Sequence, residues 1–145
     1  MHIGVVLRSM GDAASAELLA LGAARAEAVG LDSVWVVDHI AIPPDDAEGS
    51  GGLYLDPLST LGWLAGQTRR IALGTAVLIL PYRPALPTAK VLATLQALSG
   101  ERLVIGTGIG WMQAEFKAVG VSLRQRARIA DETLAFLRKC FANDV

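Results

Sequence analysis

The segment LSGERLVIGTGIGW, residues 98–111, predicts a helix end, a buried strand and a glycine-rich loop in succession. Gly100 suits the end of a helix, because glycine readily adopts the left-handed conformation that follows one. The apolar run at residues 103–105 is short and β-branched, which is typical of a strand covered on both faces. The loop after it has three glycines that allow the backbone to turn sharply or to pass close to another group: Gly106, Gly108 and Gly110. The segment therefore has the pattern of one βα junction.

The same alternation recurs along the chain. Short apolar runs predict strands, and segments rich in Ala, Leu and Glu that stop at glycine predict helices. Asp56 before Pro57 is a favourable helix start, because proline at the first helical position loses no hydrogen bond. We expect strands at residues 3–7, 33–37, 71–80 and 103–106, and helices at residues 14–29, 58–68, 87–99 (with Pro87 in the first turn) and 123–141.

The order of these elements predicts the fold class. Every expected strand is apolar without strict alternation, and each is followed by a helix, which together indicate an α/β fold with a parallel sheet and right-handed crossovers. A doubly wound sheet and part of a (β/α)8 barrel both fit this pattern. Periodicity does not show whether helices cover one face of the sheet or both, so the residues alone leave the two architectures open.

Length and composition indicate one domain, residues 1–145, and exclude several functions. The 145 residues, 52% of them hydrophobic, are enough for one core and too few for two ordinary domains. A net charge of −1 argues against a nucleic-acid partner, because the basic residues are dispersed apart from a cluster at Arg124, Arg126 and Arg128, which we interpret as a solvated helix face. No apolar run approaches the roughly 18–20 residues that span a bilayer. The first residues lack the features of a signal peptide, so we expect a cytoplasmic protein without membrane contact.

Motifs for several other chemistries are missing from the sequence. Cys140 is the single cysteine, so no internal disulfide forms, and its apolar helical surroundings predict a packed, inert thiol. We find no metal-ligand spacing, nucleophile elbow or P-loop, and therefore expect no metal site and no hydrolase or NTPase activity. Residues 106–110 are not a dinucleotide fingerprint, because the third glycine of that motif falls on Trp111.

Asp38 and His39 stand at the carboxyl end of the second expected strand. An imidazole titrates near neutral pH and can donate a proton, and a neighbouring carboxylate can orient it. The alternative is a loop histidine hydrogen-bonded to the backbone, with Asp38 as a cap. Residues 40–55 follow, with two prolines, several acidic residues and the stretch GSGG, so we expect a long loop on the active face.

Several blocks of the sequence, taken in order, resemble the bacterial luciferase-like flavin and deazaflavin oxidoreductases, a superfamily of TIM barrels. The blocks are GLDSVW (30–35), DH (38–39), YLDPL (54–58), RIALGT (70–75), and residues 98–111 with the downstream Glu115, Phe116 and Gly120. A complete barrel needs about 250 residues. The resemblance therefore implies a partial TIM (β/α)8 barrel that consists of the four N-terminal βα units.

The resemblance also implies a site at the carboxyl ends of the strands. In similar enzymes the residue that matches His39 serves as the catalytic acid, and a cis peptide bond at the place of Ala76 and Val77 forms a bulge behind the cofactor ring. The implied cofactor is FMN or the deazaflavin coenzyme F420, and the implied substrate is a small organic molecule. The implied cofactor-binding residues are Asp38, Ala76, Val77, Ile79, Ile109 and Gly110. The residues alone also allow an ordinary core strand at 75–79 and a purely structural turn at 106–110.

Two functional hypotheses follow from these observations. The first is a flavin- or deazaflavin-dependent oxidoreductase, although the sugar-phosphate dehydrogenases of the superfamily have a glutamate base near the position of Trp111, where this chain has no carboxylate. The second is a non-catalytic truncated half barrel, either a remnant or an oligomeric interaction module. An open half barrel exposes an apolar inner face and two strand edges, at 3–7 and 103–106, so we expect a homodimer or larger homo-oligomer.

Overall fold

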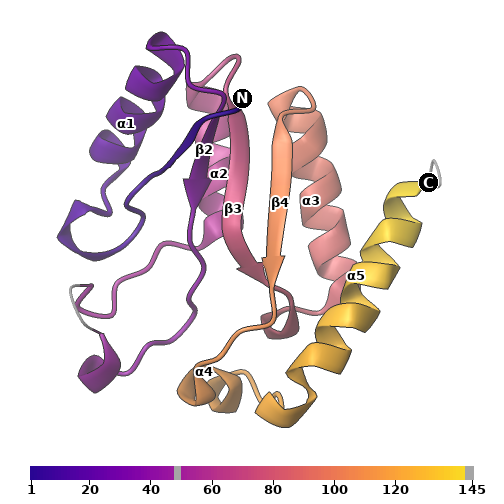
Figure 1. The fold of residues 1–145 in the computed structure, drawn as a ribbon. Helices are drawn as coiled ribbons and strands as arrows, with labels where there is room; N and C mark the ends of the chain where they lie inside the picture. The colour runs from indigo at the N-terminus through magenta and orange to yellow at the C-terminus, as the bar shows by residue number, and fades with distance from the viewer. Residues whose placement is uncertain (48–49, 143–145) are drawn as a thin grey trace.

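The computed structural model of the protein describes residues 1–47 and 50–142, and its centre is a four-stranded sheet (Figure 1). The strands lie side by side in chain order, and every neighbouring pair is parallel. They are β1 (Gly4–Val6), β2 (Ser33–Val36), β3 (Ala72–Ile79) and β4 (Leu103–Gly108). The parallel sheet expected from the sequence is confirmed, and β1 and β4 are its outer strands.

The principal helices are those that the sequence predicts. They are α1 (Ala16–Ala28), α2 (Pro57–Gln67), α3 (Ala85–Ser99) and α5 (Arg126–Ala142). The carboxylate of Asp56 accepts a hydrogen bond from the amide of Ser59 at 2.8 Å, so Asp56 caps α2 as expected. Gly100 has a φ of 68°, the left-handed conformation expected after α3.

One short helix, α4 (Gln113–Ala118), is absent from the sequence-based expectations. It has only 6 residues, too few to show a helical period, and it follows a glycine-rich loop. Tertiary packing holds it in place, because Phe116 is 1% exposed and its ring meets Tyr82 edge to face at 5.1 Å. The helix expected from residue 123 begins as a 3-10 turn, Leu123–Gln125, before α5.

The core lies between the sheet and the helices on one side of it. Val34 and Val36 of β2 are completely buried and pack with Leu61 and Leu64 of α2. Burying each of these side chains contributes about 1.5–3 kcal/mol. A second cluster joins α3 to α5 through Leu92, Leu95, Ala130 and Leu137. These clusters fix the strands, and hence the loops at the strand ends.

The other face of the sheet is covered by no helix of the described residues (Figure 1). Val6, which pairs with Trp35, is 53% exposed, and Val77 and Val104 are 40% and 44% exposed. The indole of Trp35 covers part of this face and lies so close to Gly74 that a Cβ there would collide with the ring. In the described parts of the chain, helices therefore cover one face of the sheet, which is the arrangement of a partial barrel and not of a doubly wound sheet.

The loop expected at residues 40–55 starts at the carboxyl end of β2. Its described part contains a 3-10 turn, Pro44–Asp46, and an antiparallel bridge between Met10 and Tyr54. Residues 48 and 49, within the predicted loop, lie outside the described residues. Within the described parts of the chain, no helix is both long and apolar enough to cross a membrane.

Two charged side chains bind the main chain at the amino ends of the strands. Glu27 of α1 accepts hydrogen bonds from the consecutive amides of residues 69–71, at 2.5–3.3 Å. Burial tends to raise the pKa of Glu27, but these amides and the nearby guanidinium of Arg70 outweigh it and lower the pKa. Arg102, just before β4, donates to the carbonyl oxygens of Ala65, Thr68, Ile71 and Ser99. This end of the sheet is thereby tied to the helices.

Candidate active site

The carboxyl ends of β2, β3 and β4 surround a cavity of about 470 Å³. All of the site residues predicted from the sequence lie around it, so their expected convergence at one end of the sheet is confirmed. Their chemical roles remain predictions. The lining residues are Val37, Asp38, His39, Ala76, Val77, Ile79, Gly108, Ile109, Gly110, Trp111 and Arg126.

The β3 wall of the cavity is irregular. The peptide bond between Ala76 and Val77 is cis, as the resemblance implies, and the pairing of β3 with β4 shifts register between Thr75 and Leu78. Gly108 allows β4 to approach this irregularity, because a Cβ at that position would collide with Val77. The shift in register excludes an ordinary core strand at 75–79, and Val77 forms part of the cavity wall.

His39 stands at the edge of the cavity between two aromatic rings and a carboxylate. Its ring centre is 4.7 Å from that of Tyr54 and 6.4 Å from that of Trp111, both in edge-on contact. Nδ1 of His39 lies 2.9 Å from Oε2 of Glu115. The side chain is 18% exposed. His39 therefore has a carboxylate on one nitrogen and is not a loop histidine bound only to the backbone.

Glu115 of α4 is a completely buried carboxylate behind His39. Its Oε1 accepts the amides of Ile40 at 2.5 Å and Ala41 at 3.0 Å, and its Oε2 accepts the hydroxyl of Tyr82 at 2.8 Å. Burial by itself raises the pKa of Glu115, but these hydrogen bonds and the one with His39 outweigh burial and lower it. The carboxylate is therefore ionised at neutral pH.

Asp38 belongs to a separate ion-pair network. Its buried carboxylate accepts both ends of the Arg83 guanidinium, at 2.6 and 2.9 Å, and the amide of Ile79 at 2.8 Å. Arg83 also reaches Asp56, at 3.0 Å. The expectation that a neighbouring carboxylate orients His39 needs a correction, because that carboxylate belongs to Glu115, whereas Asp38 is bound to Arg83 and the end of β3.

Arg126, the first residue of α5, brings a positive charge to the cavity. One of its terminal nitrogens, Nη1, donates to the carbonyl oxygen of Leu123 at 3.1 Å. Its Nε is buried and has no hydrogen-bond partner among the described residues. A buried donor without a partner is unfavourable, so this guanidinium suits an anionic group placed in the cavity. The expectation that Arg126 belongs to a solvated helix face needs a correction, because this residue lines the cavity and its Nε is buried.

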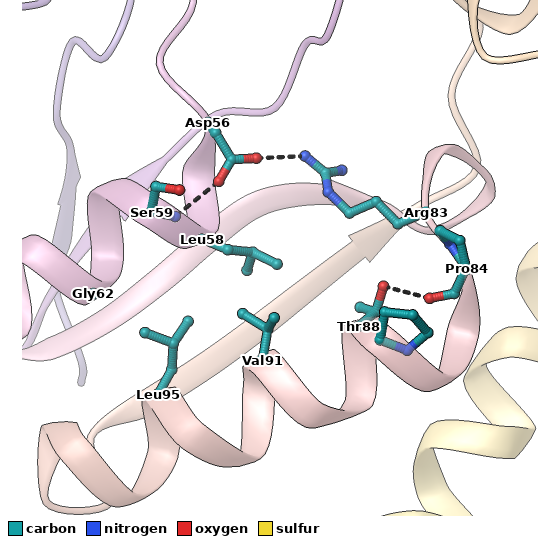
Figure 2. Close-up of a pocket in the computed structure, with 10 residues that line it drawn as sticks. Asp56, Leu58, Ser59, Gly62, Arg83, Pro84, Thr88, Val91 and Leu95 are labelled. Atoms are coloured by element: carbon teal, nitrogen blue, oxygen red, sulfur yellow. Dashed lines mark hydrogen bonds and ion pairs between the residues drawn. The ribbon is translucent and has the colours of Figure 1, made fainter.

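A second cavity, of about 450 Å³, lies between α2 and α3 (Figure 2). Leu58, Val91 and Leu95 point into it from the two helices, and Arg83 reaches Asp56 at its rim. Among the described residues that line this cavity, the ion pair supplies the only charged groups and there is no histidine. The cavity around His39 is therefore the better candidate for chemistry.

Sequence reasoning missed the partners of the predicted site residues. Glu115 was noted as part of a motif but not as the partner of His39, which is 76 positions away. Tyr82 and Arg83 stand between Pro81 and Pro84, in a turn whose side chains gave no chemical signal. Among the described residues, no group of three or more His, Cys, Asp or Glu side chains is placed to hold a metal ion.

Parallel strands in chain order with helices on one face are the arrangement of part of a (β/α)8 barrel, and the cavity beside His39 lies at the carboxyl ends of the strands, where barrel proteins have their sites. Residues 2–145 match the family model described as luciferase-like monooxygenase. The chain therefore belongs to the luciferase-like monooxygenase family.

Three proteins are similar to this chain in sequence or in fold. The F420-dependent glucose-6-phosphate dehydrogenase of Kineococcus radiotolerans is 36% identical in an alignment of 145 positions that covers 93% of this chain and 41% of the relative. The monooxygenase RslO1 of Streptomyces bottropensis has a TM-score of 0.79 at 28% identity, over 96% of this chain and 42% of that one. The third protein is the oxygenating constituent of 3,6-diketocamphane monooxygenase from the CAM plasmid of Pseudomonas putida, solved in complex with FMN. It has a TM-score of 0.77 at 19% identity, over 94% of this chain and 38% of that one, and shows likeness of fold alone. The chain spans about two fifths of the length of these proteins.

Proposed function

We propose that the protein is a flavin- or deazaflavin-dependent oxidoreductase that acts on a small organic substrate. The observation on which the proposal chiefly rests is the convergence of His39, the Ala76–Val77 bulge and the loop after β4 around one cavity. Membership of the luciferase-like family supports the same function, since a relative named above is an F420-dependent dehydrogenase. A protein of the same fold was solved in complex with FMN.

The lining of the cavity fits either FMN or F420. Both cofactors combine a flat ring system with a phosphate-bearing chain. Val77, Ile79 and Ile109 offer an apolar wall to such a ring, and the buried Nε of Arg126 offers a donor to an anionic group. When bound, the cofactor would supply the hydride or oxygen chemistry.

The residues of the chain would position the cofactor and the substrate and would supply a proton. His39 would donate a proton to the reacting substrate or hold one beside it. Asp38 would act through Ile79, whose amide it fixes at the end of β3, because its own carboxylate is bound to Arg83. Trp111, 69% exposed at the rim, would contribute an indole to the substrate side of the cavity. Because position 111 is a tryptophan and not a carboxylate, this site does not support the sugar-phosphate chemistry for which the Kineococcus relative is named.

Binding of the cofactor is the direct test. We expect FMN or F420 to change fluorescence on binding the purified protein at micromolar concentrations. Ile109→Asp should abolish this binding, because it places a charge on the apolar wall at a side chain that is 45% exposed. Val91→Asp, on α3 at 41% exposure, is the matched control and should bind normally. Failure of both cofactors to bind at tens of micromolar would contradict the proposal and favour the non-catalytic half barrel.

We also propose that a second copy of the chain covers the open face of the sheet in a homodimer or larger homo-oligomer. The support is the partly exposed side chains of Val6, Val77 and Val104, together with the outer positions of β1 and β4 in the sheet. Covering this face and its flanks would bury about 2,000 Å² in total, the range of stable dimers. Sedimentation should show a dimer or larger species at micromolar concentration. A monomer that binds no apolar dye would contradict this assembly.

A further inference from the structure

The carboxylate of Glu115 has no acceptor capacity left. Two main-chain amides share Oε1, and the hydroxyl of Tyr82 and Nδ1 of His39 share Oε2. A carboxylate offers about four lone-pair sites. Because the side chain is also completely buried, water cannot replace any of these partners. Glu115 therefore affects the cavity through His39 and through the main chain that follows it.

The ionisation of Glu115 determines which of its partners donate. An ionised carboxylate only accepts hydrogen bonds. The amides of Ile40 and Ala41 donate, and so does Tyr82, since burial and the nearby Glu115 raise the pKa of its hydroxyl and keep it protonated. Nδ1 of His39, at 2.9 Å, must then also hold a hydrogen. In the neutral ring Nε2 is consequently the nitrogen without one.

We propose that Glu115 is a positioning residue that fixes His39 in the Nδ1–H tautomer and so leaves Nε2 as the nitrogen that exchanges a proton in the cavity. This inference rests on the proposed function for its role in turnover, but not for the tautomer itself. When the imidazolium acts as the acid, the Nε2–H bond breaks as a bond from that hydrogen to the substrate forms. The ring becomes neutral and keeps its Nδ1–H bond to Glu115.

The same carboxylate also fixes the backbone that holds the histidine. The amides of Ile40 and Ala41 follow His39 directly, so ring and main chain are held by one group from α4. The loop after β2 is thereby coupled to the segment after β4. A histidine with one nitrogen held in this way keeps its proton-transfer atom in one place, which acid–base catalysis requires.

Glu115→Gln tests the tautomer with little change of shape. The amide oxygen of the substituted side chain can keep the two main-chain amides, which places its NH₂ group against His39 and Tyr82. That group donates, so Nδ1 must become the acceptor and the hydrogen must move to Nε2. Nitrogen-15 NMR of the imidazole, recorded as the pH is raised until the spectrum reports the neutral ring, should show Nδ1–H in the unchanged protein and Nε2–H in the variant. His2→Ala distinguishes the signals of the two histidines.

Tyr82→Phe is the matched control, because it removes a hydrogen bond from the same oxygen without reversing its polarity. It should leave the tautomer of His39 unchanged. An Nε2–H tautomer in the unchanged protein, or an unchanged tautomer in folded Glu115→Gln, would overturn the inference. If Glu115→Gln does not fold, the spectra of the unchanged protein and of Tyr82→Phe still decide it. If the tautomers are as expected and neither cofactor binds, the proposed function fails while the role of Glu115 in fixing the ring is supported.

Discussion

At the amino ends of the strands, Glu27 and Arg102 bind main-chain groups and one threonine hydroxyl, whereas at the carboxyl ends Glu115 and Arg83 also bind ionisable side chains. Glu27 accepts three consecutive amides, and Arg102 donates to carbonyl oxygens around the turn before β3. Glu115 accepts two amides as well, but its other oxygen contacts His39 and Tyr82. Arg83 pairs with Asp38 and Asp56.

The contacts at the amino ends of the strands suit a stabilising role, and the contacts at the carboxyl ends suit a chemical one. Main-chain amides and carbonyls do not titrate, so the amino-end contacts hold one arrangement at any ordinary pH. The carboxyl-end contacts join side chains that line or flank the cavity, so a group bound there can change them. Barrel proteins show the same division, with reactive groups at the carboxyl ends of the strands and stabilising groups at the other end.

The largest expected effect is on stability when each glutamate is truncated. Glu115→Ala leaves two amides, a hydroxyl and an imidazole buried without an acceptor, and should lower the free energy of unfolding by about 3–5 kcal/mol. Glu27→Ala exposes its three amides to water and should lower it by about 1 kcal/mol. Urea denaturation of the two variants measures the difference. Equal losses would show that the two carboxylates contribute equally to stability.

His39→Ala should separate function from stability. We expect turnover on an accepted substrate to fall about 100-fold, as on loss of a general acid, while the free energy of unfolding changes by about 1 kcal/mol or less. The matched control is His2→Ala, because His2 is 93% exposed and far in the sequence from the cavity residues. Turnover and urea denaturation measure both. A structural histidine would instead show a large loss of stability with the fall in turnover.

Replacing each arginine by lysine should give similar losses of stability and different losses of binding. Lysine cannot make the forked contacts of Arg83 or Arg102, and each variant should lose about 1–2 kcal/mol. Arg83→Lys should also weaken cofactor binding roughly 3–10-fold, because Asp38 and Ile79 beside it line the cavity. Arg102→Lys should leave binding unchanged. Fluorescence titration of the two variants compares them, and equal weakening would contradict the division between the two ends.

Much of the fold is predictable from the sequence because it depends on local patterns. Apolar runs and capping residues locate the strands and the principal helices, as at Asp56 and Gly100. The choice of a half barrel over a doubly wound sheet is not local, because both have the same alternation of elements. It came from the resemblance, and the open face of the sheet in the described residues confirms it. The helix α4 escaped prediction because its stability comes from the burial of Phe116.

The candidate site is less predictable, because its contacts join distant parts of the chain. The resemblance correctly placed His39, Val77 and Ile109 around one cavity. It did not show that Glu115 contacts His39 or that Arg83 pairs with Asp38, since these partners are 76 and 45 positions apart. A charged residue beside Phe116 in an apolar context was the one local signal for a buried carboxylate.

The smallest expected effect is on acid stability, where the two ends of the sheet should behave alike. Folding lowers the pKa of both Glu27 and Glu115 below the ordinary 4.5. Each carboxylate therefore contributes stability that is complete above its unfolded pKa and is lost as the pH falls through its lower folded pKa. Glu27→Gln and Glu115→Gln should each flatten the decline of the free energy of unfolding below about pH 4.5. Urea denaturation between about pH 6 and pH 3 measures this decline. If only Glu115→Gln flattens the decline of the free energy of unfolding, the amides at residues 69–71 do not stabilise the charge of Glu27. The two carboxylates would then differ in their contribution to acid stability.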